Sequence, residues 1–197
     1  PGRGRALAST VPSPELNIIP IQSLDDPRTA EYRAIRDAHL RQFASDSDGP
    51  PEGVFIAEGE LVVRQLIDSR FRTRSILLSP QRLTTVRDCL ERLPPQTPIF
   101  LADQTVMNGI VGFNIHRGIL AAGDRPSEPD LDSLLKASSS LAILEDLSNH
   151  DNVGGIFRCT AALAGIPLAP LLQGPAILLS PRCCDPLYRK AIRVSVG

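Results

Sequence analysis

The sequence contains no tryptophan, and aromatic residues make up only 4% of its 197 residues. A protein that stacks many nucleic-acid bases needs aromatic side chains gathered on one surface. The composition therefore argues against a broad aromatic platform for base stacking.

Long apolar runs and metal-binding cysteine patterns are also missing. No stretch of eighteen or more apolar residues occurs, and the first residues, PGRGRALAST, lack the apolar core of a secretory signal. The four cysteines, Cys89, Cys159, Cys183 and Cys184, show no C-x-x-C or Cys/His spacing typical of zinc sites. We therefore expect a cytoplasmic, soluble protein with no membrane partner and no metal, whose cysteines are reduced, mostly buried and used in packing.

Positive and negative charges nearly balance, because the formal net charge is −1. This balance argues against a uniformly basic nucleic-acid-binding coat. The charge is unevenly spread, however: seven arginines and three acidic residues lie between Arg64 and Arg92, and four basic residues and one acid lie between Arg182 and Arg193. Such stretches either contact phosphates or form solvated helix faces, and the sequence leaves both readings open.

The first two thirds of the chain alternate between short strands and helices. Residues 1–16 are rich in Pro, Gly, Ser and Arg and are expected to form a flexible tail. Residues 17–123 are expected to form one α/β domain, with a parallel or mixed sheet covered by helices. Periodicity predicts strands near 17–21, 54–57, 75–79, 98–102 and 118–122, and helices over 27–43, 58–69 and 81–93. In the second helix the apolar spacing predicts that four side chains face the core: Leu61, Val62, Leu66 and Ile67.

A linker and a second domain follow. Pro, Gly and acidic residues in GDRPSEPDLDS interrupt the pattern, so residues 124–138 are expected to be a linker. Residues 139–197 are expected to begin with a strand, SLAILED, followed by the loop LSNHDN and the helix VGGIFRCTAALA. After the loop IPLAPLLQGP come a further strand, AILLS, and the segment PRCCDPLYRKAIRVSVG. The chain is thus predicted to be α/β in class, with two domains.

The strand, loop and helix around DNVGGIFR carry the strongest chemical signal. Free amides and the helix dipole at such a junction can hold an anion, but the glycine spacing fits neither a dinucleotide fingerprint nor a phosphate loop. A purely structural reading stays open, in which Asn152 or Asp151 caps the helix and Gly154 and Gly155 allow close packing. Arg158 fits that reading poorly, because it lies on the same helix face as the glycines, about one turn from the N-terminal end of the helix. At that place it is within reach of a bound group.

The residues Asn152, Gly154 and Arg158, in the pattern N-x-G-x-x-x-R after an apolar strand, resemble the first signature motif of the SpoU/TrmH class of RNA 2′-O-ribose methyltransferases. The segment ILLSPRCCDPLYRKAIRVSVG is similar to the D-P-x-x-x-K-A-x-R-x-S-x-G segment of this family. Upstream, IQSLDDPR, FIAEGELVVRQLI, SILLS and FNIHRGILAA resemble its accessory substrate-binding domain. The resemblance covers about residues 17–197.

This resemblance implies a small RNA-binding-like α/β domain followed by a knotted, Rossmann-like SPOUT methyltransferase domain. It implies methyl transfer from S-adenosylmethionine to a ribose 2′-hydroxyl of tRNA or rRNA by a homodimer. Arg158 matches the family's catalytic arginine, Asn152 would orient the loop or Arg158, and Gly154 and Gly155 would set the loop geometry. A guanidinium is too basic to act as a base, so Arg158 is expected to stabilise the developing alkoxide or to contact a phosphate. His150 is expected to be an ordinary loop residue.

RNA is expected to be held mainly through its phosphates by scattered cationic side chains. In the first domain His116 and Arg117 occupy a turn where they could contact RNA, with a purely structural turn as the alternative. Arg189, Lys190 and Arg193 recur at near-helical spacing and could contact the RNA backbone, with a solvated helix face as the alternative.

Two features depart from the family pattern. The segment IPLAPLLQGP, residues 166–175, is longer than the usual turn of the family, and no role is assigned to it. The sequence ends at Gly197, before the second and third motifs that bind the cofactor in the family. The resemblance therefore implies a family member cut short at its C-terminal side, with no cofactor-binding residues assigned. A non-catalytic RNA-binding protein and an unrelated nucleotide-binding α/β protein stay open as alternatives.

Overall fold

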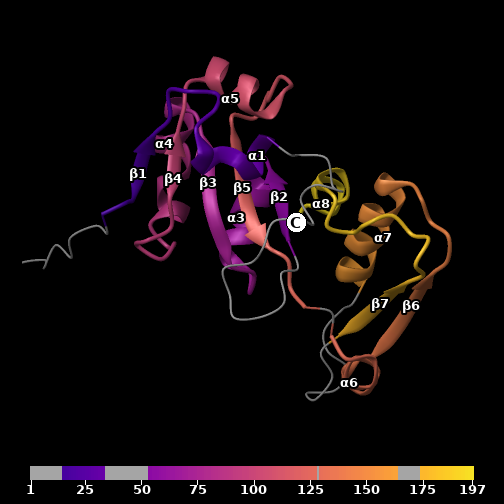
Figure 1. The fold of residues 1–197 in the computed structure, drawn as a ribbon. Helices are drawn as coiled ribbons and strands as arrows, with labels where there is room; N and C mark the ends of the chain where they lie inside the picture. The colour runs from indigo at the N-terminus through magenta and orange to yellow at the C-terminus, as the bar shows by residue number, and fades with distance from the viewer. Residues whose placement is uncertain (1–14, 34–52, 128, 164–173) are drawn as a thin grey trace, which may run out of the picture.

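The computed structural model describes residues 15–33, 53–127, 129–163 and 174–197. In these ranges the chain forms two separate β-sheets with helices packed beside them (Figure 1). Most of the predicted tail, residues 34–43 of the predicted first helix and nearly all of the loop over residues 166–175 lie outside the described residues.

Five strands form the first sheet: β1 Ile18–Pro20, β2 Val54–Glu58, β3 Thr73–Leu78, β4 Ile99–Leu101 and β5 Ile119–Asp124. Their spatial order is β1-β4-β3-β5-β2. β4 lies parallel to β1 and β3, whereas β5 runs antiparallel to β3 and β2. The predicted strands and the predicted mixed sheet are confirmed, with β2 at one edge.

Helices cover both faces of this sheet: α1 Ala30–Arg33, α3 Glu60–Asp68, α4 Pro80–Leu90 and α5 Gln104–Val111. Alternate strand residues point to opposite faces, so Val54 and Ile56 of β2 enter the core with α1 and α5. Phe55 and Ala57 enter the core with α3 and α4. The first unit is therefore a sheet between two helical layers.

The inward face of α3 differs from its prediction at Leu61, whose residue surface is 65% exposed. Val62, Val63 and Leu66 are buried instead. Because the helix begins at Glu60, these three side chains form one stripe toward the sheet, and Leu61 falls on its outer edge.

A helix, α6 Leu131–Ala137, forms inside the predicted linker. The carboxylate of Asp130 accepts a hydrogen bond from the Ser133 amide at 2.9 Å and so caps the free end of this helix. That backbone hydrogen bond holds the pKa of Asp130 below its ordinary value. Asp124, the first residue of the predicted linker, belongs to β5. The division into domains stays a prediction.

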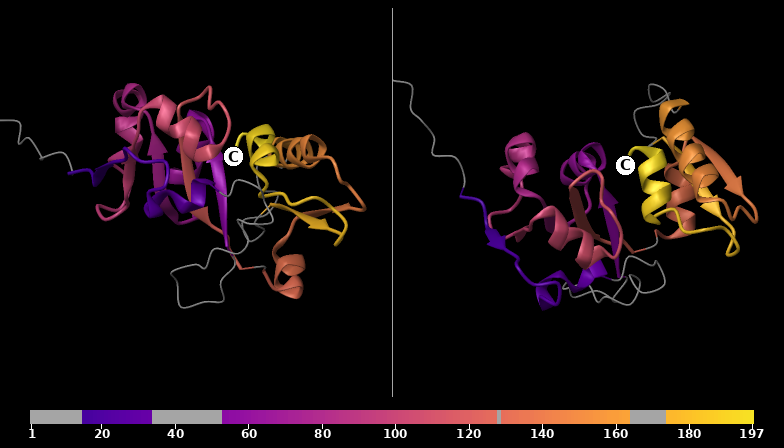
Figure 2. Two further views of the ribbon diagram at one scale, coloured as in Figure 1. Left: turned by 45° about the horizontal axis from the view of Figure 1, so that its top comes forward. Right: turned by 90° about the horizontal axis from the view of Figure 1, so that it is seen from above.

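The second sheet pairs β6 Ser140–Leu144 in parallel with β7 Pro175–Leu179, and α7 His150–Leu163 and α8 Arg189–Ser195 lie beside it. α8 packs along α7 and also contacts β2 of the first sheet, so it lies between the two units (Figure 2). Ile192 of α8 is buried in the same core as α3 and α4. This helix therefore belongs to the packing of both units.

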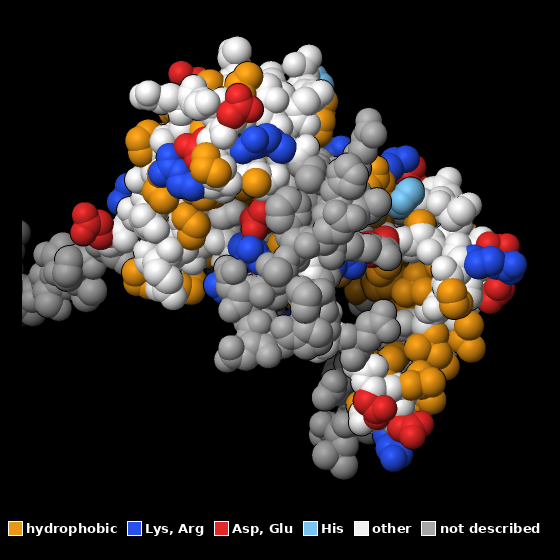
Figure 3. All heavy atoms as spheres, viewed as in Figure 1, with side chains coloured by type: hydrophobic (Ala, Val, Ile, Leu, Met, Phe, Trp, Pro, Cys, Tyr) orange, Lys and Arg blue, Asp and Glu red, His pale blue; other side chains and the backbone are white. Residues whose placement is uncertain are grey.

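Apolar side chains are exposed on the second sheet, where Leu141 and Ile143 of β6 are 41% and 69% exposed (Figure 3).

Among the described residues, no helix is long and apolar enough to cross a membrane. No group of three or more His, Cys, Asp or Glu side chains in those ranges could hold a metal ion.

All four cysteines are free, but only Cys89 is buried. Cys159 on α7 is exposed, and Cys183 and Cys184 are half-buried. The expectation of mostly buried cysteines is therefore wrong, because the outer face of α7 is open to solvent at Cys159.

Candidate active site

The junction between β6 and α7 holds the predicted motif. The side-chain oxygen of Asn149 accepts hydrogen bonds from the amides of Asp151 at 2.8 Å and of Asn152 at 3.3 Å. Asn149 is therefore the residue that caps α7, and the prediction that Asn152 or Asp151 does so is wrong. The helix begins three residues earlier than the predicted Val153, so Asn152 also lies inside it.

The loop before this helix is tied to the segment that follows β7. The amide of Asp146, whose φ of 55° is left-handed, donates to the Ser180 hydroxyl at 3.1 Å. The Cys184 amide donates to the carbonyl oxygen of Leu147 at 2.9 Å. Because β6 and β7 are parallel, both loops leave from the same end of the sheet. Hydrogen bonds thus join the loop after β6, residues 145–149, to the loop after β7, residues 180–188. Together the two loops form one rim at this end of the second sheet.

Gly154 and Gly155 have different surroundings. A Cβ at Gly154 would overlap the carbonyl oxygen of Ala191 on α8 and lie 3.0 Å from the Cβ of Val194. A Cβ at Gly155 would meet nothing within 4 Å. The close approach that Gly154 permits is thus to α8, whereas Gly155 has no such contact. Both glycines lie within α7 rather than in the loop before it.

Arg158 lies one helical turn beyond Gly154 and is exposed. It makes no hydrogen bond or ion pair with any described residue. Asn152 is also exposed, but six residues along a helix turn it about 120° away from Arg158. Within the described residues the Arg158 guanidinium has no partner, and Asn152 does not lie beside it.

His150 is the first residue of α7 rather than part of the preceding loop. Its ring lies 4.1 Å from the ring of Tyr188, centroid to centroid, just before α8. Next to it, Asp151 pairs with Lys190 at 2.8 Å. These contacts hold the beginnings of α7 and α8 together, which gives His150 a packing role.

The cationic side chains of α8 are paired inside the chain. Arg189 and Arg193 contact the carboxylate of Glu58 on β2, at 2.9 Å and 3.6 Å. Arg189 also lies over the ring of Phe113, 4.4 Å from its centroid. The Lys190 ammonium contacts Asp151. Each of the three cationic side chains that were predicted to contact RNA therefore pairs with a carboxylate of the same chain.

His116 and Arg117 lie in the turn before β5 and are exposed. Neither makes an ion pair with a described residue. The Arg117 side chain covers Gly59, because a Cβ at residue 59 would lie 2.6 Å from the Arg117 Cδ. With φ at 93°, Gly59 is in a conformation that favours glycine. The side chain of Arg117 in this turn therefore packs closely against the main chain of Gly59.

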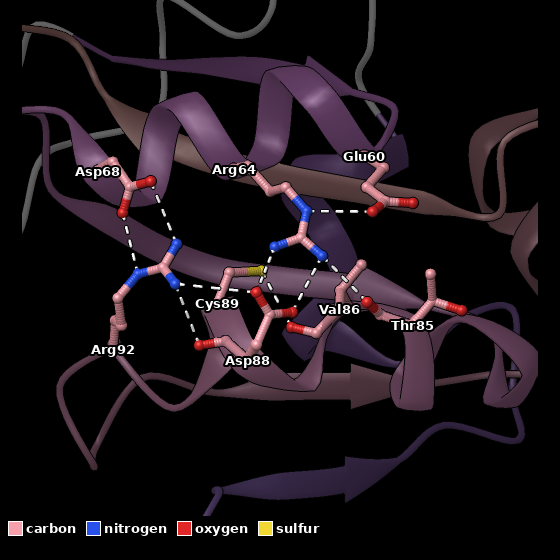
Figure 4. A network of polar contacts seen from close by, with 8 residues as sticks. All are labelled: Glu60, Arg64, Asp68, Thr85, Val86, Asp88, Cys89 and Arg92. Carbon is pink, nitrogen blue, oxygen red and sulfur yellow. Dashed lines mark hydrogen bonds and ion pairs between the residues drawn. The ribbon is translucent and has the colours of Figure 1, made fainter.

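Two arginines of the stretch between residues 64 and 92, Arg64 and Arg92, pair with carboxylates of α3 and α4 (Figure 4). Arg64 on α3 contacts Glu60 at 3.0 Å and Asp88 on α4 at 2.6 Å. The hydrogen bond to Asp88 raises the pKa of Arg64, and the same bond lowers the pKa of Asp88. Arg92 pairs with Asp68 at 3.0 Å. These arginines tie two helices together.

A hollow of about 280 Å³ lies elsewhere, between the beginning of α1 and the strand β3. Arg28, Arg72 and Arg74 line it. Asp26 pairs with Arg28 at 2.6 Å, and Asp124 pairs with both Arg72 and Arg74. The hydrogen bond from Arg28 lowers the pKa of Asp26 to about 2. Because carboxylates match these guanidiniums, the hollow has little surplus charge for an anion.

Two comparisons find known proteins that are similar to this chain. No protein-family model matches the sequence. A curated relative, an uncharacterized tRNA/rRNA methyltransferase of Mycobacterium tuberculosis, is 33% identical over 173 residues, which cover 88% of this chain and 55% of the relative. A relative named in the same way in Mycobacterium bovis shows the same identity and coverage.

Solved structures share the fold. An rRNA methyltransferase of Sinorhizobium meliloti with bound AdoMet matches with a TM-score of 0.65 at 17% identity, over 92% of this chain and 61% of that one. The SpoU methyltransferase AviRb of Streptomyces viridochromogenes, in complex with AdoMet, matches with a TM-score of 0.62 at 15% identity, over 87% of this chain and 58% of that one. The chain is similar to curated tRNA/rRNA methyltransferases and shares the fold of a SpoU methyltransferase.

The predicted resemblance to SpoU/TrmH methyltransferases and the predicted SPOUT-type α/β fold class are thereby confirmed. The predicted cofactor, S-adenosylmethionine, is confirmed for the SpoU family. The chain spans about half the length of the curated relatives that it matches, 55%. The roles of Arg158, Asn152, His116 and Arg117 stay predictions.

Proposed function

We propose that the protein transfers a methyl group from S-adenosylmethionine to a ribose 2′-hydroxyl of tRNA or rRNA. The observation that carries this proposal is Arg158, an exposed guanidinium without a partner among the described residues, at the position of the family's N-x-G-x-x-x-R motif. An arginine with a purely structural role would be expected to form an ion pair, as Arg189 of α8 does with Glu58.

The reaction needs what a free guanidinium supplies. A ribose hydroxyl is a weak nucleophile, so it must be aligned with the methyl group and lose its proton during attack. Bound S-adenosylmethionine would supply the methyl group and leave as S-adenosylhomocysteine, and the hydroxyl proton would pass to solvent. Arg158 stabilises the negative charge that develops on the oxygen, or holds the neighbouring phosphate. Asn152 would orient the loop before α7, where the side chain of Asn149 accepts a hydrogen bond from the Asn152 amide.

We assign the first contact with RNA to His116 and Arg117. Both are exposed at the turn before β5, and neither is paired with a described carboxylate. The three cations of α8 remain possible RNA contacts by prediction, but a phosphate there would compete with Glu58 or Asp151. The proposed assembly is a cytoplasmic homodimer, and the exposed apolar side chains on the second sheet and α7 favour association.

The test is methyl transfer by the complete gene product to total tRNA and rRNA, followed by mass spectrometry of the released nucleosides. We expect 2′-O-methylated ribose with the parent protein. Arg158→Ala abolishes the product while RNA affinity is unchanged, and the control Arg182→Ala retains both.

Full activity of Arg158→Ala would remove this residue from the reaction. A methyl group found on a base would overturn the ribose assignment. RNA binding without any methylation would favour a non-catalytic RNA-binding protein. A weak dependence of RNA binding on salt would argue against phosphate contacts.

A further inference from the structure

A carboxylate of the first unit lies between two guanidiniums of the second. Glu58, the last residue of β2, is only 7% exposed. Its Oε2 lies 2.9 Å from Nη1 of Arg189 and 3.6 Å from Nη1 of Arg193. In sequence Glu58 and Arg189 are 131 residues apart. A nearly buried carboxylate needs partners that replace its lost hydration, and here both come from α8.

Two further contacts connect the same parts of the molecule. Arg125, just after β5, pairs with Asp185, just before α8, and both side chains are nearly buried. Ile192 of α8 fills the core that α3 and α4 cover. The unit that carries the motif is therefore joined to the first sheet by two ion-pair clusters and an apolar contact, in addition to the covalent connection.

We propose that Glu58 is a positioning residue, which holds α8 and thereby the second unit at a fixed orientation to the first. Gly59, the next residue, is covered by Arg117 of the turn assigned to RNA. On the other side, α8 packs against Gly154 of α7, one turn before Arg158. The carboxylate thus lies on a continuous packed path from the RNA-contacting turn to the reactive arginine. The inference that this orientation matters for catalysis rests on the proposed function.

The orientation can be measured without RNA, cofactor or activity. Residual dipolar couplings of the amides in the ¹⁵N-labelled 197-residue chain report the alignment of each unit separately. In the parent chain one alignment tensor fits both units. In Glu58→Gln the shared tensor is lost: each unit fits its own structure, but with a different tensor. If Glu58 only stabilised its own strand, the two tensors would stay equal.

A second pair of substitutions reaches the same contact from α8, in case Glu58→Gln unfolds the first unit. Arg189→Gln combined with Arg193→Gln also removes both ion pairs, and we expect the same loss of the shared tensor. Arg182→Gln is the control, because among the described residues Arg182 pairs only with Glu145 and Asp146, which belong to its own unit. It retains one tensor.

Different tensors in the parent chain, or equal tensors in both folded variants, would overturn the proposal. In the complete protein, Glu58→Gln is expected to lower kcat for methyl transfer while leaving RNA affinity unchanged. If methyl transfer is absent altogether, the proposed function fails, but the dipolar couplings still decide whether Glu58 fixes the orientation.

Discussion

Gly154 of α7 lies against the main chain of Ala191 in α8, so closely that a Cβ at residue 154 would overlap the Ala191 carbonyl oxygen. The neighbouring Gly155 faces open space. Two adjacent glycines of one motif therefore have different physical reasons to be glycine, since only Gly154 is required by the packing of the two helices.

Substituting alanine for each glycine separates these reasons. Gly154→Ala forces α8 away from α7 and is expected to lower the free energy of unfolding by about 1–3 kcal/mol, the usual cost of overpacking. Gly155→Ala is expected to raise it by up to about 1 kcal/mol, because alanine favours a helix. Urea unfolding followed by circular dichroism measures both. Equal shifts of the two midpoints would contradict the close helix contact.

The cap of α7 gives a second matched pair. Asn149→Ala removes the acceptor for the Asp151 and Asn152 amides and is expected to cost about 1 kcal/mol in thermal or urea unfolding. Asn152→Ala, inside the helix, is expected to leave the unfolding midpoint nearly unchanged. A larger loss in Asn152→Ala than in Asn149→Ala would show that the helix begins later than His150.

The regular elements could be predicted from the sequence where the local pattern is clear. The short apolar runs in VFIA, SILLS and AILLS identified the strands. α5 was not predictable in this way, because Asn108 and Gly109 form a pair typical of turns in the middle of it. Burial of Met107, Ile110 and Val111 against the sheet overrides that local preference.

The site was predictable only as far as its local motif. The N-x-G-x-x-x-R pattern located Arg158, and the structure leaves that side chain exposed and unpaired among the described residues. The partners of α8 could not be predicted, because the spacing of Arg189, Lys190 and Arg193 shows a cationic face but not what that face meets. Glu58 comes to this face only through the tertiary fold.

The ion-pair network between α3 and α4 predicts unequal roles for two arginines. Arg64 is 26% exposed and contacts Glu60, Asp88 and the Thr85 carbonyl, whereas Arg87 is 53% exposed and pairs with Glu91 on its own helix. We expect Arg64→Ala to lower the urea midpoint clearly and Arg87→Ala to change it little. Similar midpoints in the two variants would contradict a bridging role for Arg64.

Acid should weaken the same bridge. The hydrogen bond from Arg64 holds the pKa of Asp88 below its ordinary value of 3.8. A lowered pKa in the folded state means that the unfolded chain binds this proton more readily, so the contribution is present above about pH 4 and is lost as the pH falls through the folded pKa. The stability difference between the parent and Asp88→Asn is therefore expected to shrink on acidification. A difference independent of pH would exclude an ionic bridge.

Thiol reactivity provides a measurement of burial in both units at once. Cys159 on α7 is exposed, whereas Cys89 on α4 is buried, and burial raises the pKa of the Cys89 thiol. Because the thiolate is the reactive form, Cys89 is protected both by poor access and by its proton. In the native chain we expect a disulfide reagent to modify Cys159 first and Cys89 only after denaturant is added. Peptide mass spectrometry of timed samples identifies the order, with Cys159→Ser as the control that removes the fast phase. Fast modification of Cys89 in the native chain would show that this side chain of α4 is accessible to solvent rather than buried.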